Sequence, residues 1–245
     1  MKTALITGAN KSIGFETARQ LLQQGYFVYL GSRDSQKGQQ AVSQLHAEGF
    51  QQVELLPIDV DDLHSVQAAR QALEQKIQVL DVLINNAGVP GKMPQTPLET
   101  NIREFKQVFD TNFFGIIQVT QAFMDLLKQS PQPRIVNVSS SLGLLTLQSD
   151  PSWKYYGVMP AAYVPSKAAL NAYTVVLAHH LRDTAFKVNA VDPGYPATDF
   201  NHNTGTETVA HAAARVVKAA TLGSESPTGQ FFSEDSAPDT GISPW

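Results

Sequence analysis

The chain has 245 residues, of which 42% are hydrophobic and 16% charged, with a formal net charge of -4 and no cysteine. The low charged share argues against intrinsic disorder, the negative charge argues against nucleic acid or a membrane surface as partner, and the missing cysteine excludes disulfides, thiolate-bound metals and a cysteine nucleophile. No apolar run reaches the ~18 residues of a membrane span and no signal peptide is recognisable, so we expect a soluble, cytoplasmic, globular protein.

Short β-branched or aromatic runs alternate with longer segments of helical period along the whole chain. Most of these runs are apolar at both alternating positions, which is typical of parallel strands covered by helices on each face. The alternation predicts an α/β fold with one doubly wound parallel sheet of about seven strands, formed by a single domain over residues 1–245. In chain order we expect a strand at 3–7, a helix at 13–24, a strand at 27–30, a helix at 35–48, a strand at 53–58, a helix at 63–76, a strand at 82–84, a helix at 102–128, a strand at 134–138, a helix at 161–181, a strand at 187–191, a helix at 208–221 and a strand at 230–232.

Three stretches fit neither pattern, at about residues 89–100, 142–160 and 195–207. Each follows a predicted strand, so all three should lie beyond the carboxyl edge of the sheet, where open α/β sheets bind ligands. We therefore expect these loops to form the substrate site.

The first predicted strand runs into the sequence Thr7-Gly8-Ala9-Asn10-Lys11-Ser12-Ile13-Gly14, where the first predicted helix begins. Glycines there permit a tight turn and a close backbone approach, so a pyrophosphate can bind the free N–H groups of the helix N-terminus. The alternative is an ordinary strand–helix turn. The position in the first βα turn of a βαβ pattern favours a dinucleotide site.

A basic residue follows the second predicted strand: Arg33, with Asp34 one residue later. In dinucleotide folds an acidic residue at this point binds the adenosine ribose, whereas a nearby basic residue accommodates a 2′-phosphate. Lys11, inside the first turn, is a second cation that can converge on the same phosphate. We therefore predict NADP(H) rather than NAD(H), the alternative being that both cations are merely solvated.

Tyr163 and Lys167 are spaced i, i+4 near the start of a predicted helix, which places the phenol and the ammonium on one face. The cation should lower the pKa of the phenol, so that it exchanges a proton nearer neutrality. A serine cluster, Ser139 to Ser141, ends the fifth predicted strand and would reach the same cleft. Each motif is weak alone, because the spacing is common by chance and serines at strand ends usually serve turns.

Taken together, the motifs follow the order seen in the short-chain dehydrogenase/reductase family, which the chain resembles from about residue 3 to residue 232. Within the family it looks most like the NADPH-dependent carbonyl reductases, on segments 7–11, 111–115 and 229–232. The resemblance implies a Rossmann fold and the reversible reduction of a ketone or aldehyde to an alcohol. It rests on the motifs Thr7-Gly8-x-x-x-Ser12-Ile13-Gly14, Asn85-Asn86-Ala87-Gly88, Asn112, Ser140, Tyr163-x-x-x-Lys167 and Pro193-Gly194.

Four catalytic residues are implied by the resemblance. Tyr163 would be the general acid that protonates the carbonyl oxygen, and Lys167 would lower its pKa and hydrogen-bond the nicotinamide ribose. Ser140, which with Gly143 matches the family's Ser-x-x-Gly pattern, would stabilise the developing alkoxide. Asn112, in a kinked part of the long predicted helix, would place a water that relays protons to Lys167.

The resemblance also implies a cofactor site drawn from several segments. The first turn would bind the phosphates, the segment after the third predicted strand the adenine, the Asn-Asn-Ala-Gly segment the adenosine side and the Pro-Gly loop the carboxamide. The implied NADP(H)-binding residues are Gly8, Asn10, Lys11, Ser12, Ile13, Gly14, Arg33, Asp59, Val60, Asn85, Ala87, Gly88, Tyr163, Lys167, Pro193, Gly194 and Thr198.

Three features depart from the family pattern. Ser12 replaces a glycine of the phosphate turn, which suits a negative φ, with its hydroxyl directed at the adenosine phosphate. Pro196 stands where the family often has valine, so the backbone N–H that bonds the carboxamide is missing. The segment between Ser140 and Tyr163 is longer than in typical members but shorter than in monomeric carbonyl reductases, which leaves a monomer and a homo-oligomer both open.

The expected substrate is a small-molecule carbonyl compound with an apolar or aromatic body, because apolar side chains lie in or beside the second and third loops. Lys154 is the only cation in these two loops, so we expect no carboxylate or phosphate clamp. The six histidines show no ligand spacing, so we expect no metal. Two other functions remain open: a reductase of 3-oxoacyl thioesters, and a non-catalytic NADP(H)-binding sensor. The side chains expected to wall the cleft are Leu142, Leu144, Leu145, Trp153, Tyr155, Tyr156, Met159, Tyr195 and Phe200. The alternative is that about half of them pack the loops onto the body of the protein.

Overall fold

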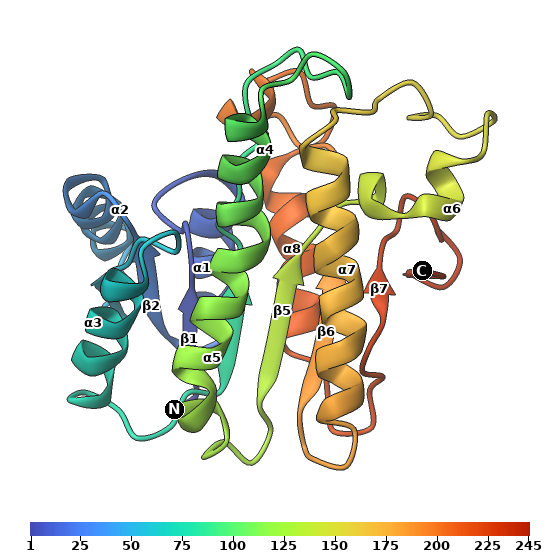
Figure 1. Ribbon diagram of the computed structural model, residues 1–245. Helices are drawn as coiled ribbons and strands as arrows, with labels where there is room; N and C mark the ends of the chain where they lie inside the picture. The colour runs from blue at the N-terminus through green and yellow to red at the C-terminus, as the bar shows by residue number, and fades with distance from the viewer.

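An eight-stranded sheet forms the centre of the computed structural model, which describes residues 1–245 (Figure 1). The strand order is β3-β2-β1-β4-β5-β6-β7-β8, with the first seven strands parallel and β8 antiparallel to β7. The predicted doubly wound parallel sheet is confirmed, with one strand more than expected. The extra strand has only two residues, too few to show an alternating pattern. The strands are β1 (Thr3–Ile6), β2 (Phe27–Ser32), β3 (Val53–Pro57), β4 (Val82–Asn85), β5 (Arg134–Val138), β6 (Lys187–Val191), β7 (Phe231–Phe232) and β8 (Ile242–Ser243).

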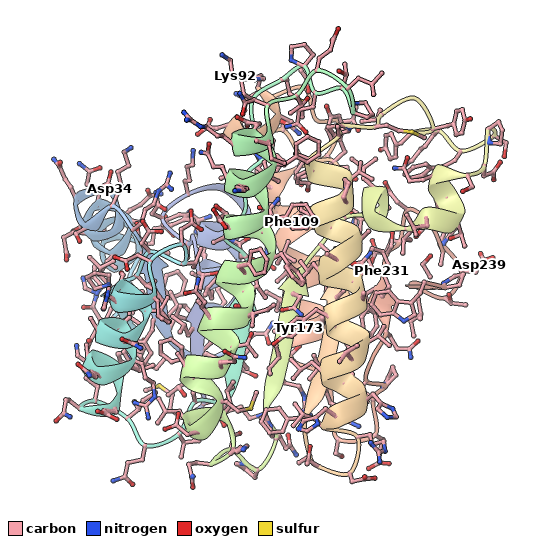
Figure 2. The ribbon with its side chains drawn as sticks, in the orientation of Figure 1. Asp34, Lys92, Phe109, Tyr173, Phe231 and Asp239 are labelled. Atoms are coloured by element: carbon pink, nitrogen blue, oxygen red, sulfur yellow. The ribbon has the colours of Figure 1, made fainter.

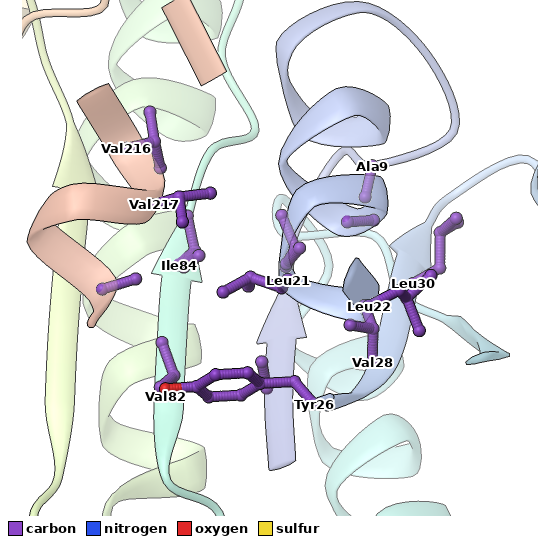
Figure 3. Packing of buried hydrophobic residues seen from close by; sticks show 14 of the residues in the cluster. Ala9, Leu21, Leu22, Tyr26, Val28, Leu30, Val82, Ile84, Val216 and Val217 are labelled. Atoms are coloured by element: carbon purple, nitrogen blue, oxygen red, sulfur yellow. The ribbon is translucent and has the colours of Figure 1, made fainter. Parts of the chain in front are cut away.

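Helices cover both faces of this sheet (Figure 1). Successive residues of β1 point to opposite faces, with Ala4 and Ile6 in one apolar layer and Leu5 in the other. Figure 3 shows the first layer, in which Leu21 of α1 and Val217 of α8 pack over the sheet. None of the helices is both long enough and apolar enough to cross a membrane. The first layer is covered by α1 (Ser12–Gln23), α2 (Ser35–Ala47) and α8 (Val209–Ala220), and the second by α3 (Leu63–Glu74), α5 (Gly115–Leu127) and α7 (Tyr163–His180).

The long helix predicted over 102–128 is interrupted around Asn112, where the family resemblance implied a kink. It consists of α4 (Ile102–Phe109), a π-helical turn at Asp110–Phe114 and α5. The wider turn carries Asn112, whose side chain is fully buried, and π-helical turns inside helices often mark functional sites. Gly115 follows directly because a Cβ there would lie 2.8 Å from the carbonyl oxygen of Val60, just past β3.

Two of the three predicted loops contain short helical turns. Residues 142–160 include the end of a 3₁₀ turn at Ser141–Gly143 and all of α6 (Leu145–Gln148), and residues 195–207 include a 3₁₀ turn at Asp199–Asn201. The expectation that these stretches are free of helix is therefore wrong. Turns of three or four residues are too short for a helical period to show in the sequence. The first loop has no helix, and its Lys92 lies at the top of the molecule in Figure 2.

Candidate active site

The turn between β1 and α1 packs tightly against the segment that follows β4. Gly8 has a φ of 62°, and a Cβ there would lie 3.0 Å from the Ala87 Cα. The Thr7 hydroxyl accepts hydrogen bonds of 3.0 Å from the N–H groups of Asn86 and Ala87. The Asn86 amide donates in return to the carbonyls of Thr7 and Gly8, at 2.9 and 3.1 Å. Two motifs that are 70 or more residues apart in the chain thus form one hydrogen-bonded unit.

The N-terminus of α1 has unused hydrogen-bond donors. The backbone N–H groups of Ser12, Ile13 and Gly14 donate no hydrogen bond within the chain, and Lys11 at the N-cap gives no side-chain cap. Free N–H groups at the positive end of a helix dipole fit the pyrophosphate of a dinucleotide.

The expectation of a negative φ at Ser12 is wrong. Its φ is 51°, so a serine adopts the left-handed conformation that glycine takes more readily. The glycine usual in the family would have no Cβ to accommodate here.

The cations expected at the 2′-phosphate have different surroundings. Arg33, exposed just beyond β2, forms no ion pair, whereas the Lys11 ammonium lies 2.9 Å from an Asp199 carboxylate oxygen. Asp34 caps α2, because its carboxylate accepts a 3.0 Å hydrogen bond from the N–H of Lys37. That N–H lowers the pKa of Asp34, with a further contribution from the Lys37 ammonium. The acidic neighbour of Arg33 is therefore engaged by its own helix.

The residues expected near the adenosine differ in their burial and in their hydrogen-bond partners. Asp59 and Val60 follow β3; the Asp59 carboxylate accepts a 3.2 Å bond from the N–H of Asp61 and is only half-buried. Asn85 is fully buried, and its amide donates to the Thr120 hydroxyl at 3.1 Å and to the Asn137 side-chain oxygen at 2.9 Å. The amide nitrogen of Asn85 thus joins β4 to β5 and α5, while its buried side-chain oxygen has no hydrogen-bond partner.

The four predicted catalytic residues come from the segment after β5, which carries Ser140, from the π-helical turn, and from α7. Tyr163 is the first residue of α7 and is 9% exposed, and the Lys167 ammonium lies 5.7 Å from the centre of its ring. Lys167 donates a 2.8 Å hydrogen bond to the carbonyl of Val138, the last residue of β5, which stands just before the serine cluster that contains Ser140. A Cβ on Gly88 would lie 3.3 Å from the Asn112 side-chain oxygen and 3.7 Å from the Lys167 nitrogen, so both polar atoms border this glycine.

The pKa values of this pair differ from the sequence expectation. Burial raises the pKa of Tyr163 above its ordinary value; the Asp192 carboxylate adds to the rise and the Ser140 hydroxyl opposes it. Burial lowers the pKa of Lys167 to about 8, opposed by Asp192. The Lys167 ammonium donates to the Val138 carbonyl, and burial sets the direction of the pKa shift for both groups.

Asp192, which the sequence reasoning missed, is a buried carboxyl at the end of β6. It accepts a 3.1 Å bond from the N–H of Gly194 and a 3.1 Å bond from the Ser233 hydroxyl. Burial raises the pKa of Asp192, while hydrogen bonds from Gly194, Ser141 and Ser233 lower it. The signal was a charged residue closing an apolar strand, directly before Pro193-Gly194.

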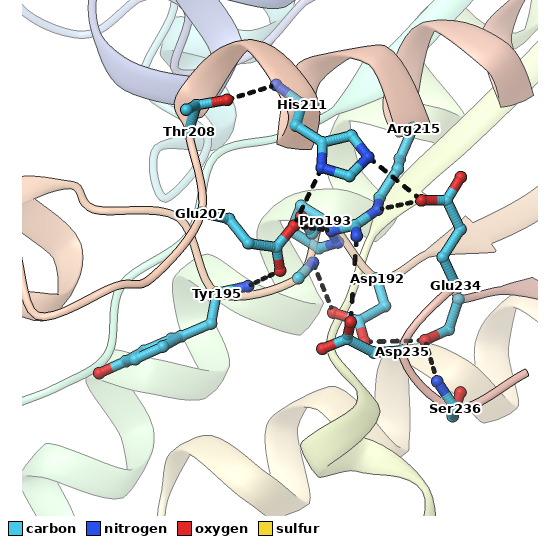
Figure 4. A network of polar contacts seen from close by, with 12 residues as sticks. Asp192, Pro193, Tyr195, Glu207, Thr208, His211, Arg215, Glu234, Asp235 and Ser236 are labelled. Atoms are coloured by element: carbon cyan, nitrogen blue, oxygen red, sulfur yellow. Dashed lines mark hydrogen bonds and ion pairs between the residues drawn. The ribbon is translucent and has the colours of Figure 1, made fainter. Parts of the chain in front are cut away.

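A second missed residue, Arg215 of α8, holds the turn that follows β6 (Figure 4). Its guanidinium donates to the Pro193 carbonyl at 2.8 Å and lies 2.7 Å from a Glu207 oxygen and 2.9 Å from a Glu234 oxygen. Glu207 also accepts a 3.1 Å bond from the N–H of Tyr195. The sequence signal that could have indicated this residue is an arginine between the apolar residues of α8.

These bonds leave the loop around Pro196 without a free backbone donor. The N–H of Gly194 bonds Asp192, those of Tyr195 and Ala197 bond Glu207, and that of Thr198 bonds the Asn201 side chain. Since Pro196 has no N–H, no backbone N–H from 194 to 198 is left for a carboxamide.

The side chains expected to wall the cleft divide into four groups. Phe200 packs edge-on against Tyr163, with ring centres 5.7 Å apart. Tyr155 lies with its ring centre 5.4 Å from that of Trp153, edge-on, and 6.3 Å from that of Tyr195, tilted, so an aromatic cluster joins the second and third loops. Leu144 instead packs into a small core with Ala190 and Phe231 of the sheet. The remaining apolar residues include Leu145 and Met159, which line an open groove of about 500 Å³ beside the start of α7. Pro97, Phe105 and Val164 line the same groove.

Known proteins with the same sequence pattern and fold share this arrangement of elements. The sequence model of the short chain dehydrogenases matches residues 2–208. A (+)-neomenthol dehydrogenase of Capsicum annuum is 32% identical, over 94% of this chain and 94% of its own. The solved structure of salutaridine reductase from Papaver somniferum covers 94% of this chain and 99% of its own with a TM-score of 0.83 and 29% identity, and that of an NADPH-bound carbonyl reductase from chicken fatty liver covers 95% and 96% with a TM-score of 0.82 and 26% identity. The chain therefore belongs to the short-chain dehydrogenase family of oxidoreductases.

Proposed function

We propose that the protein reduces a ketone or aldehyde to the alcohol with NADPH, and catalyses the reverse reaction with NADP⁺. The observation that carries the proposal is the meeting of Asn112 and Lys167 at Gly88, with Tyr163 one helical turn from Lys167. Gly88 belongs to the segment that packs on the phosphate turn, where free N–H groups suit a dinucleotide.

Each residue of the site has a role in the proposed reaction. NADPH, when bound, supplies a hydride to the carbonyl carbon. The Tyr163 phenol, which is protonated near neutrality, gives its proton to the carbonyl oxygen. The Ser140 hydroxyl donates a hydrogen bond to the same oxygen, and the Lys167 ammonium stabilises the phenolate that forms. Asn112 holds a water through which protons return.

The titration of Lys167 predicts the pH dependence of reduction. The ammonium form dominates below a pKa of about 8, so kcat/KM should fall about tenfold per pH unit once the pH exceeds that value. Lys167→Arg keeps a positive charge and should lose this break. The check is the pH profile of kcat/KM for both proteins from pH 6 to 10. A break near pH 8 that persists in the arginine variant contradicts the assignment to Lys167.

NADPH is the proposed cofactor because Arg33 is exposed and unpaired while Asp34 is engaged in capping α2. Arg33→Asp replaces a charge-assisted bond to the 2′-phosphate by repulsion, so the Kd for NADPH should rise about 10- to 100-fold, with little change for NADH. Fluorescence titration of both nucleotides measures this, with the exposed Arg182→Asp as control. An unchanged ratio of the two Kd values means that the 2′-phosphate binds elsewhere.

The proposed substrates are carbonyl compounds with an apolar or aromatic body. Phe200 lies against the phenol of Tyr163, and the aromatic cluster of Trp153, Tyr155 and Tyr195 joins the second and third loops. A panel of aryl ketones, quinones and acetoacetyl thioesters, followed by loss of NADPH absorbance, tests this choice. Turnover of aryl ketones or quinones supports the proposal, preference for the thioesters identifies a 3-oxoacyl thioester reductase, and no turnover of any compound supports a sensor.

A further inference from the structure

The first turn of α7 lacks a local N-terminal cap. The helix begins at Tyr163, and the residue before it, Ala162, has no side-chain oxygen to accept from the helix N–H groups. Two donors of this turn are otherwise satisfied: the N–H of Val164 bonds the Pro160 carbonyl and that of Ser166 bonds the Ala162 carbonyl. Pro165 has no N–H. The N–H groups of Ala162 and Tyr163 therefore need an acceptor from elsewhere.

Gln95, in the first predicted loop, supplies that acceptor. Its side-chain oxygen accepts from the N–H of Ala162 at 2.8 Å and from that of Tyr163 at 3.3 Å. The side chain is 8% exposed although its neighbours along the loop are exposed. A glutamine at this depth, 67 residues away in the chain, thus completes the start of the helix.

The amide nitrogen of Gln95 fixes the oxygen in place. It donates to the Pro90 carbonyl at 2.9 Å. Gly91 provides the room, because a Cβ on it would lie 2.4 Å from this nitrogen. Val89, next to Pro90, exchanges two bonds with the Asn112 side chain, at 2.8 and 2.9 Å. The loop that carries Gln95 is therefore tied to Asn112.

The carbonyl of Tyr163 is held from the other side. It accepts a 2.7 Å bond from the Ser166 hydroxyl, which in turn accepts a 3.1 Å bond from the Asn112 amide. Both the N–H and the C=O of Tyr163 are thus bonded to side chains that connect to Asn112. This closed set of bonds determines where the phenol lies relative to Lys167 and Asn112.

We propose that Gln95 is a positioning residue for Tyr163. It touches neither substrate nor cofactor; it caps α7 so that the phenol is presented at one place. The inference rests on the proposed role of Tyr163 as general acid. Loss of the cap lets the first turn fray, and displacements of about 1 Å at a reacting group cost about 100-fold in rate.

Two substitutions isolate the acceptor oxygen. Gln95→Met and Gln95→Glu both lose the bond to Pro90, but only the glutamate keeps an oxygen for the two N–H groups, at a helix end that favours negative charge. We expect Gln95→Met to lower kcat about 100-fold with an unchanged Kd for NADPH, and Gln95→Glu to regain about tenfold of that loss. Gln20→Met, which removes a comparable 2.9 Å amide bond to the Ala210 carbonyl far from Tyr163, serves as control and should keep its kcat.

Amide hydrogen exchange provides a readout that does not depend on turnover. The N–H groups of Ala162 and Tyr163 should lose protection in Gln95→Met and keep it in Gln95→Glu, while the middle of α7 stays protected in both. Equal kcat values and equal protection in the two variants overturn the proposal, as does a Gln95→Met protein with normal kcat. The two proposals can fail separately. If hydrogen-exchange protection follows the expected pattern but the unmodified protein turns over no compound of the panel, the catalytic role of Tyr163 is refuted and the capping role of Gln95 stands.

Discussion

Tyr163→Phe is expected to lower kcat for carbonyl reduction by about 10³-fold, within the range that a general acid contributes. Phenylalanine keeps the ring that packs against Phe200 but has no proton to give to the carbonyl oxygen. The buried phenol hydroxyl is the only atom removed, so the fold and the Kd for NADPH should stay close to their original values. Single-turnover kinetics of NADPH oxidation under saturating substrate measures the chemical step directly.

Tyr173→Phe on the same helix is the matched control. Its hydroxyl is also largely buried, and burial raises the pKa of Tyr173, opposed by a hydrogen bond with Thr120. Tyr173 packs against Phe113 on the second helical layer, so its loss of a hydroxyl should leave kcat within about twofold. A Tyr163→Phe protein that retains more than a tenth of the original kcat removes Tyr163 from the role of proton donor.

The second large effect is expected for Arg215→Met, which should reduce the free energy of unfolding by about 3–5 kcal/mol. The Arg215 side chain is 7% exposed, and its removal leaves the Glu207 and Glu234 carboxylates without the guanidinium, with only the His211 ring beside them. The Pro193 carbonyl loses its donor at the same time. Urea unfolding followed by circular dichroism gives the change in the free energy of unfolding.

Arg70→Met provides the comparison, because Arg70 also contacts two carboxylates. These belong to Glu74 and Asp125, whose side chains are 42% and 66% exposed, so the loss should stay near or below about 1 kcal/mol. Adding Glu207→Gln to Arg215→Met should recover part of the lost stability, since it removes an unpaired charge. Equal losses for the two arginine variants contradict a stabilising role of the Arg215 network.

Several elements could be predicted from the sequence because their physical cause is local. The parallel strands show in short runs that are apolar on both faces, as β1 does with Leu5 toward one layer and Ile6 toward the other. The phosphate turn and the Tyr163–Lys167 pair show in spacings along a single element. The conformation of Ser12 could not be predicted, because serine by itself disfavours a positive φ and nothing in the sequence pattern of the turn indicates one.

The amino-acid sequence by itself determined where most of the strands and helices lie and which residue types stand at the carboxyl edge of the sheet, because these follow from periodicity and from spacing within one element. Only the tertiary structure decided that Gln95 caps the helix of Tyr163, that Arg215 holds the turn after β6, and that burial raises the pKa of the phenol. The first two depend on groups brought together across 67 and 22 positions of the chain, and the third on the exclusion of water by packing, neither of which a pattern along the sequence contains.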